Sequence, residues 1–213
     1  MTDPRRPLVA VLDYGIGNLR SAQKALERVG ADARLTADAG LVADADAVVL
    51  PGVGAFGACM DALRAARLDA LAVDAAASGR PFLGVCVGMQ MLFEGSDESP
   101  GVAGLGVLPG RLRLLPEGVK RPQMQWNRLD VRRPSRLFAS VADPVWVYFV
   151  HSYAADTESE AVVATCDYGG PVVAAVERDA MWATQFHPEK SGSVGLEVLR
   201  GFVDAARDTV VAR

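Results

Sequence analysis

The sequence predicts an α/β fold: a mostly parallel sheet with flanking helices and an additional β layer from the second half of the chain. In the first half, short apolar runs alternate with segments of helical periodicity, a pattern typical of parallel strands joined by helical crossovers. After residue 93, β-like runs follow one another without such helices. We see neither a linker nor an internal repeat, and therefore expect one domain over residues 1–213.

Composition narrows the possible functions. Half of the 213 residues are apolar, enough for a substantial core, and the formal net charge of −4 argues against a nucleic-acid partner. The polar residues 1–7 precede no long apolar run, so we expect neither a signal peptide nor a membrane span. The three cysteines lie far apart and form no CxxC pair, which argues against disulfides and a metal site and favours the cytoplasm.

The first half is expected to contain four strands and four helices. Apolar runs predict strands at residues 8–12, 34–36, 47–50 and 81–85, and helical spacing predicts helices at 19–29, 58–66, 68–78 and 87–93. Asn18 is placed to cap the first helix, at the end of a turn-rich loop (residues 13–18). That loop follows a strand, at the position where parallel sheets commonly bind ligands, although a plain turn would have the same pattern.

The second half begins with a polar, glycine-rich loop at residues 94–104. We expect its strands to form an antiparallel layer or an extension of the sheet, and a closing helix to follow at residues 194–211. The predicted strands are residues 106–115, 126–131, 145–150, 162–165, 172–176 and 181–186.

Cys86 lies between a predicted buried strand and a helix, with Gly84 two residues before it and Gly88 two residues after it. This strand–turn–helix pattern is that of a nucleophile elbow, which in many hydrolases carries a serine. The glycines suit a sharp turn in which a side chain would collide with backbone. A buried cysteine that only packs at a strand end would also fit this stretch alone.

A glycine-rich loop follows the strand at residues 47–50. Gly52 and Gly54 flank Val53, so the backbone can approach a ligand and direct its amides toward it. An elbow enzyme needs an amide from a second loop of this kind to stabilise an oxyanion, together with the amide of Val87 after the nucleophile. Taken alone, the loop is equally consistent with a tight turn.

Only two histidines can act as a base for Cys86. His187 follows the last predicted strand and is followed by Pro188 and Glu189, so a carboxylate can reach its ring and fix the tautomer. His151 ends another apolar strand, with no acidic residue before Asp156. We therefore favour His187, although this triplet alone would more commonly be a solvated surface turn.

Together, these motifs resemble class I glutamine amidotransferases, and among them most closely the glutaminase subunits of imidazole glycerol phosphate synthase. The resemblance covers nearly the whole chain and implies a flavodoxin-like arrangement of the sheet. Its motifs are residues 13–19, 51–54, 84–90, 148–153 and 187–191. In one segment the chain departs from the family, because Gln123 and Gln125 stand where a histidine and a glycine are usual. The surface that faces the partner is therefore expected to differ in detail from that of the family.

The resemblance implies a Cys86–His187–Glu189 triad that hydrolyses L-glutamine to glutamate and ammonia without a cofactor. The implied oxyanion and substrate-binding residues are Gly52, Val53, Gly54, Val87, Gln90, Ser152 and Tyr153. The family's partner is a cyclase with a (β/α)8 barrel, which uses the ammonia to make imidazole glycerol phosphate and AICAR from PRFAR in histidine biosynthesis. Asn18, Trp126 and Lys190 are the implied interface residues of the heterodimer.

Three alternatives stay open from the sequence. The chain could be the glutaminase subunit of another synthase, of the pyridoxal phosphate or anthranilate type, against which the opening motif and Trp126-Asn127 argue. It could be a cysteine hydrolase or peptidase of similar fold, which would cleave peptides without a partner. A catalytically inactive interaction module is a third possibility, and the intact triad residues argue against it.

Overall fold

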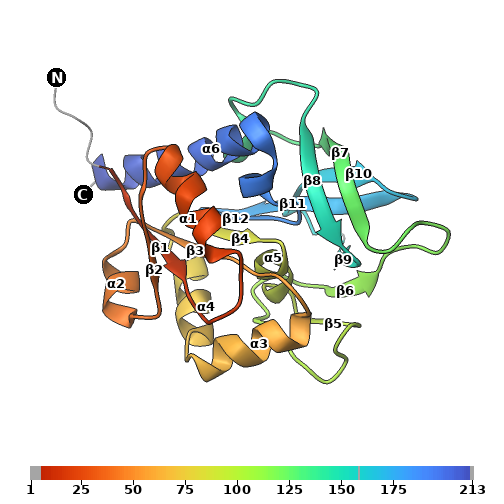
Figure 1. The fold of residues 1–213 in the computed structure, drawn as a ribbon, viewed down its shortest axis with the longest axis horizontal. Coiled ribbons are helices and arrows are strands. Elements are labelled where there is room, and N and C mark those ends of the chain that lie inside the picture. The colour runs from red at the N-terminus through yellow and green to blue at the C-terminus, as the bar shows by residue number, and fades with distance from the viewer. Residues whose placement is uncertain (1–5, 158, 212–213) are drawn as a thin grey trace.

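The computed structural model describes residues 6–157 and 159–211. In its first half, strands and helices alternate as the periodicity predicts (Figure 1). The elements are β1 (Leu8–Leu12), α1 (Leu19–Arg28), β2 (Asp32–Thr36), α2 (Ala39–Asp44), β3 (Ala47–Leu50), α3 (Phe56–Ala65), α4 (Asp69–Ala77), β4 (Phe82–Val85) and α5 (Val87–Met91).

Strands dominate the second half until a closing helix. These elements are β5 (Gly95–Ser96), β6 (Arg111–Leu114), β7 (Gln123–Val131), the 3-10 turn η1 (Arg136–Phe138), β8 (Trp146–His151), β9 (Tyr153–Asp156), β10 (Val162–Asp167), β11 (Pro171–Arg178), β12 (Met181–Thr184), the 3-10 turn η2 (Pro188–Lys190) and α6 (Gly192–Val211).

One nine-stranded sheet runs through both halves, in the order β2-β1-β3-β4-β12-β11-β10-β7-β8. From β2 to β12 neighbouring strands are parallel, and from β12 to β8 they are antiparallel. The predicted extension of a mostly parallel sheet is therefore confirmed. Strands β5, β6 and β9 form a separate small sheet beside it.

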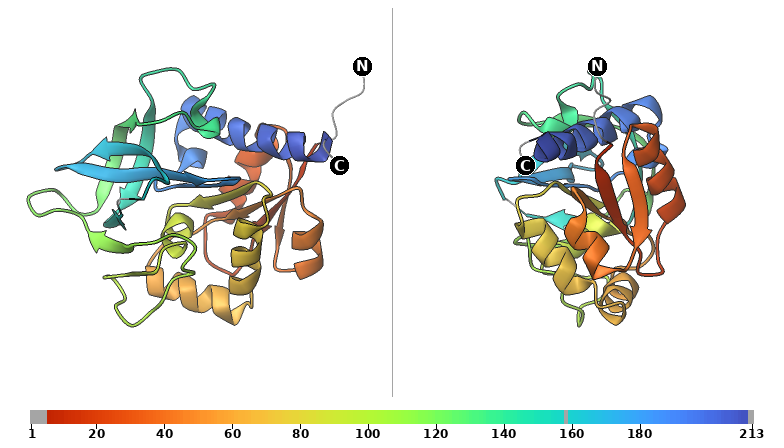
Figure 2. Two further views of the ribbon diagram at one scale, coloured as in Figure 1. Left: turned by 180° about the vertical axis from the view of Figure 1, so that it is seen from behind. Right: turned by 90° about the vertical axis from the view of Figure 1, so that its left-hand side faces the viewer.

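Helices cover both faces of the parallel part. Helices α1 and α6 lie together on one face, and α3, α4 and α5 lie on the other (Figures 1 and 2). Strands β3 and β4 are buried along their whole length, which explains why they appear in the sequence as continuous apolar runs rather than as alternating ones. Within the described residues, no helix combines the length and the apolar character needed to cross a membrane.

Several predicted boundaries were wrong. Helix α3 begins at Phe56, earlier than expected, and β6 occupies only Arg111–Leu114 of the predicted 106–115 strand. Helix α2 and the short strands β5 and β9 were not predicted, because segments of two to six residues carry too little periodicity. Asn18 occupies the N-cap position of α1, but its side chain makes no capping hydrogen bond.

We expect Gly88→Ala to destabilise the fold by more than about 2 kcal/mol, because the new methyl group would have to displace backbone rather than a flexible side chain. A Cβ atom at Gly88 would lie 1.9 Å from the carbonyl oxygen of Leu50. Urea unfolding measures the change. Gly101→Ala is the control, since that Cβ atom has nothing within 4 Å. Equal stabilities of the two variants would contradict the predicted close approach.

Candidate active site

The pairing of β4 with β12 determines where the site lies. These parallel neighbours align Val85 with Thr184, and the amide of Cys86 donates a hydrogen bond to the carbonyl of Thr184 at 2.7 Å. Both chain segments then leave the sheet at the same edge. Cys86 and His187, which are 101 positions apart in the sequence, therefore emerge side by side.

The backbone of Cys86 has the strained conformation of an elbow. Its φ of 55° and ψ of −111° are unusual for a residue other than glycine, and strain of this kind is concentrated at functional sites. Gly84 and Gly88 make the turn possible, because a Cβ atom at Gly84 would approach the backbone of Gly88 to 3.1 Å. Helix α5 begins directly after Cys86, so its first amides point toward the region above the sulfur.

His187 lies between a carboxylate and the thiol. Its Nδ1 is 2.8 Å from Oε1 of Glu189, and its ring lines the same cavity as Cys86, close enough for the thiol to raise the pKa of the imidazole. The main chain holds it in place, because the His187 amide donates to the carbonyl of Tyr148 at 3.0 Å and the Ser191 hydroxyl donates to the His187 carbonyl at 2.7 Å. The structure thus brings the three predicted triad residues together.

The surroundings of His187 favour its protonated form. Burial by itself lowers the pKa, but hydrogen bonds and charge interactions with Cys86 and Glu189 outweigh it and raise the pKa to about 9. The imidazole is 2% exposed, so water screens these interactions little. At neutral pH the ring therefore carries the proton that an amine leaving group needs.

His151 has a different environment. Burial and the positive charge of His187 lower its pKa to about 4, although a hydrogen bond to the carbonyl of Tyr153 opposes the shift. That bond joins Nδ1 to the carbonyl oxygen at 2.9 Å, and no acidic residue of the described chain pairs with the ring. His151 is therefore neutral at pH 7 and lies in the pocket wall without a carboxylate to orient it.

A cavity of about 390 Å³ opens above Cys86 and is large enough for an amino acid. The predicted pocket residues that line it are Val53, Gly54, Val87, Gln90, Ser152 and Tyr153, together with Cys86, His187 and Lys190. Gly52 lines a smaller adjacent cavity that also contacts Asn18 and Glu189. A Cβ atom at Gly52 would meet the amide nitrogen of Gly88 at 2.7 Å, so this glycine lets the loop lie against the elbow.

Gln185 is a site residue that sequence reasoning missed. Its side-chain nitrogen donates to the sulfur of Cys86 at 3.7 Å, and its side-chain oxygen accepts from Gln90 at 3.0 Å. Gln90 also donates to the carbonyl of Tyr153 at 3.0 Å. This chain of bonds couples the thiol to the far wall of the pocket. The sequence feature that could have indicated Gln185 as a site residue is its position two residues before His187.

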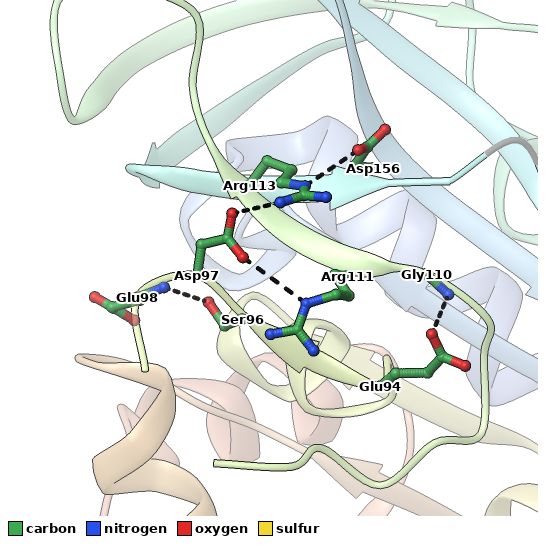
Figure 3. Close-up of polar contacts among 8 residues, drawn as sticks. All are labelled: Glu94, Ser96, Asp97, Glu98, Gly110, Arg111, Arg113 and Asp156. Carbon is green, nitrogen blue, oxygen red and sulfur yellow. Dashed lines mark hydrogen bonds and ion pairs between the residues drawn. The ribbon is translucent and has the colours of Figure 1, made fainter. Parts of the chain in front are cut away.

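Glu98 was also missed, because it lies in the polar loop after residue 93. It lines the pocket, and its Oε2 accepts a hydrogen bond from the amide of Phe56 at the start of α3, at 2.7 Å. Its own amide donates to the hydroxyl of Ser96 at 3.1 Å (Figure 3). Among the described residues that line this pocket, Glu98 carries the one carboxylate.

Ion pairs on the small sheet support the segment that carries Glu98. Asp97 pairs with Arg113 at 2.8 Å and with Arg111 at 3.8 Å, and Arg113 also pairs with Asp156 at 3.3 Å (Figure 3). These groups are substantially exposed, so each pair contributes little to stability. Together the pairs connect Asp97, which follows β5, with side chains of β6 and β9, next to Glu98.

The predicted interface residues differ in exposure and in their distance along the chain from the triad. Trp126 is 48% exposed and makes an edge contact with the ring of Tyr148, with the centroids 6.1 Å apart. Met124, on the same face of β7, is 60% exposed. Lys190 is exposed at the pocket, whereas Asn18 is half-buried beside the smaller cavity. An exposed tryptophan and methionine on one face of a strand are typical of a docking surface.

The two unusual glutamines differ in environment. Gln123 is fully buried, its side-chain nitrogen approaches the sulfur of Cys166 at 3.7 Å, and its side-chain oxygen has no partner in the described structure. Gln125 is exposed on β7 next to Trp126. Gln125 is thus the one of the two that a partner can contact directly.

Comparison with known proteins agrees with this fold. The model of the family "Glutamine amidotransferase class-I" matches residues 10–205. Curated relatives named imidazole glycerol phosphate synthase subunit HisH include those of Methanothermobacter thermautotrophicus, 49% identical over 94% of this chain and 100% of the relative, and Syntrophotalea carbinolica, 48% identical over 92% and 100%. The HisH protein from Synechococcus elongatus is 47% identical over 92% of this chain and 93% of its own length.

Solved structures confirm the fold at lower identity. A putative GMP synthase protein from Thermoplasma acidophilum superposes with a TM-score of 0.73 at 18% identity, covering 98% of each chain. PurLQS from Thermotoga maritima gives 0.73 at 20% identity, over 96% of this chain and 99% of that one. The chain therefore belongs to the class I glutamine amidotransferase family, and within it to the HisH subunits of imidazole glycerol phosphate synthase.

The raised pKa of His187 predicts the alkaline limit of activity. Below about pH 9 the ring keeps its proton, and above that it loses the proton that the departing ammonia requires, so kcat/KM should fall with a midpoint near pH 9. An ordinary histidine would give a midpoint near 6.5. Glu189→Gln should move the midpoint to lower pH, because it removes one of the groups that raise the pKa. A wild-type midpoint near 6.5 would contradict this assignment.

Proposed function

We propose that the chain hydrolyses L-glutamine through Cys86, His187 and Glu189 and delivers the ammonia to a cyclase subunit. The observation that carries the proposal is the buried hydrogen bond between Glu189 and His187, with the imidazole beside the Cys86 thiol in a pocket of amino-acid size. A solvated surface turn would not bury a histidine and a carboxylate, with side chains 2% and 4% exposed, next to a thiol.

The pocket offers suitable groups to both ends of free glutamine. With its side-chain amide over Cys86, the amino-acid end of glutamine would lie near Glu98, Ser152 and Tyr153. The Glu98 carboxylate would pair with the α-ammonium group, since charge-assisted bonds are the stronger ones. Gln90 would form the pocket floor, because its amide is already fixed to Gln185 and to the Tyr153 carbonyl.

The chemistry then proceeds in two stages. The Cys86 thiolate attacks the side-chain amide carbon, and the amides of Val87 and of the 52–54 loop hold the oxyanion, each donor contributing about 3 kcal/mol in comparable sites. His187 donates its proton to the leaving nitrogen, which departs as ammonia and leaves a thioester on Cys86. His187 then takes a proton from water, whose oxygen attacks the thioester and releases glutamate.

Because the product is ammonia, the proposed function includes a partner protein that uses it. Ammonia released into solvent would be protonated and lost, and the HisH relatives are named as subunits of a synthase. The side chains of Met124 and Trp126 are exposed on β7, and Lys190 is exposed at the pocket. We assign these three residues to the interface with the cyclase barrel. The three free thiols of the chain are consistent with the proposed cytoplasmic location of this assembly.

Substitution of the triad tests the reaction. In complex with the cyclase, Cys86→Ala should abolish glutamine-dependent activity, and His187→Asn should lower glutaminase turnover at least about a hundredfold, since general acid–base catalysis contributes about 10²–10⁴-fold. His151→Asn is the matched comparison and should retain more activity. Ammonia release with and without the partner is the measurement. If only His151→Asn abolished turnover, the choice of base would be wrong.

Glu98→Gln tests how glutamine is oriented. The substitution keeps an oxygen acceptor for the Phe56 amide but removes the charge that faces the α-ammonium, so KM for glutamine should rise about tenfold, or about 1.4 kcal/mol. Asp97→Asn is the control, because it removes a charge from the adjacent residue, whose side chain pairs with Arg111 and Arg113. Steady-state kinetics would refute the role of Glu98 if both variants had the same KM as the wild type.

A further inference from the structure

The side chain of Gln185 donates a hydrogen bond to the sulfur of the proposed nucleophile. Its Nε2 lies 3.7 Å from Sγ of Cys86, and both residues are buried, Gln185 completely and Cys86 with 3% of its surface exposed. Water therefore has little access to the sulfur, and a thiolate formed there has to be stabilised by donors of the protein. The Gln185 amide is such a donor.

The groups around this amide determine its orientation. The carbonyl of Tyr153 can only accept, so the side-chain nitrogen of Gln90 must face it, at 3.0 Å. The same nitrogen donates to Oε1 of Gln185 at 3.0 Å, which directs the oxygen of Gln185 toward Gln90 and its nitrogen toward Cys86. A flipped Gln185 amide would place two donors opposite each other. The hydrogen bonds therefore fix an N–H donor at the thiol.

Both ends of this arrangement are held in place. The Tyr153 carbonyl also accepts from Nδ1 of His151 at 2.9 Å, so both of its lone pairs are used. The main-chain amide of Gln185 donates to the carbonyl of Ala174 in β11 at 2.8 Å. Because the Gln185 side chain is held at both ends, little reorganisation is needed when negative charge develops on the sulfur.

We propose that Gln185 is a catalytic residue that stabilises the thiolate of Cys86 through the N–H of its side-chain amide. The inference deepens the proposed function and rests on the role of Cys86 as the nucleophile. The amide itself transfers no proton. It stabilises the thiolate that attacks glutamine, whose proton is on His187, and again the thiolate that leaves when water cleaves the thioester.

Other groups near the sulfur keep their protonation states when Gln185 is replaced. Tyr14 and Cys59 hold their protons, because burial raises the pKa of the phenol and of the thiol. His151 is neutral at pH 7, since burial lowers its pKa to about 4. The charged side chains nearby are those of Glu98, His187 and Lys190 in the cavity and of Glu189 behind His187.

The test measures alkylation of Cys86 by iodoacetamide in the full chain, as a function of pH. Gln185→Met removes the N–H without adding charge, and Gln185→Leu does so with a different shape. In both variants the rise of the alkylation rate should move up by about one pH unit, because loss of a hydrogen bond to a charged group lowers the thiolate fraction about tenfold. Mass spectrometry identifies the alkylated cysteine.

Gln123→Met is the matched control. Gln123 is also fully buried, and its Nε2 also approaches a cysteine sulfur at 3.7 Å, but that sulfur belongs to Cys166. The pH profile of Cys86 alkylation should therefore be that of the wild type in this variant. Urea unfolding checks that each variant is folded.

Steady-state kinetics in the complex with the cyclase completes the test, and kcat should fall about tenfold in Gln185→Met. An unshifted alkylation profile in Gln185→Met and Gln185→Leu would overturn the inference. So would an equal shift in Gln123→Met, which would indicate general damage to the core. Failure of the proposed function is distinguishable, because it would appear as glutamine-dependent activity retained in Cys86→Ala.

Discussion

The pairing of β4 with β12 is the contact on which the site depends. The two strands lie about a hundred residues apart in the sequence, and their parallel register puts the residues that follow them at one edge of the sheet. The bond from the Cys86 amide to the Thr184 carbonyl extends that register by one residue into the turn. A slip of one position would point the thiol and the imidazole to opposite faces.

Glycines around this contact set how closely the backbone segments approach. Gly88 lies against the Leu50 carbonyl and Gly52 against the Gly88 amide, so the elbow and the neighbouring loop are in direct backbone contact. The loop is also held by Tyr14 and Cys59. The elbow and the loop beside it are therefore held close together by direct backbone contact.

The second half of the chain supplies His187 and Glu189 after β12 and also surrounds the site. Glu98, which follows β5 of the small sheet, lines the pocket, and β7 exposes Trp126 and Met124. The antiparallel strands thus give a catalytic α/β core a substrate wall and an exposed apolar surface. The pocket above Cys86 opens between these two parts and is lined by residues from both.

The sequence by itself determined the parallel core, because buried strands, helical periodicity and glycine turns are local properties of the chain. It also indicated Cys86, His187 and Glu189, since each lies in a motif that signals its chemistry within a few residues. Only the tertiary structure decided which histidine approaches the thiol, because that depends on the pairing of β4 with β12 across a separation of about a hundred residues. Gln185, Glu98 and the loop contacts of Tyr14 and Cys59 became visible only there, since a hydrogen bond between distant segments leaves no periodic pattern in the sequence.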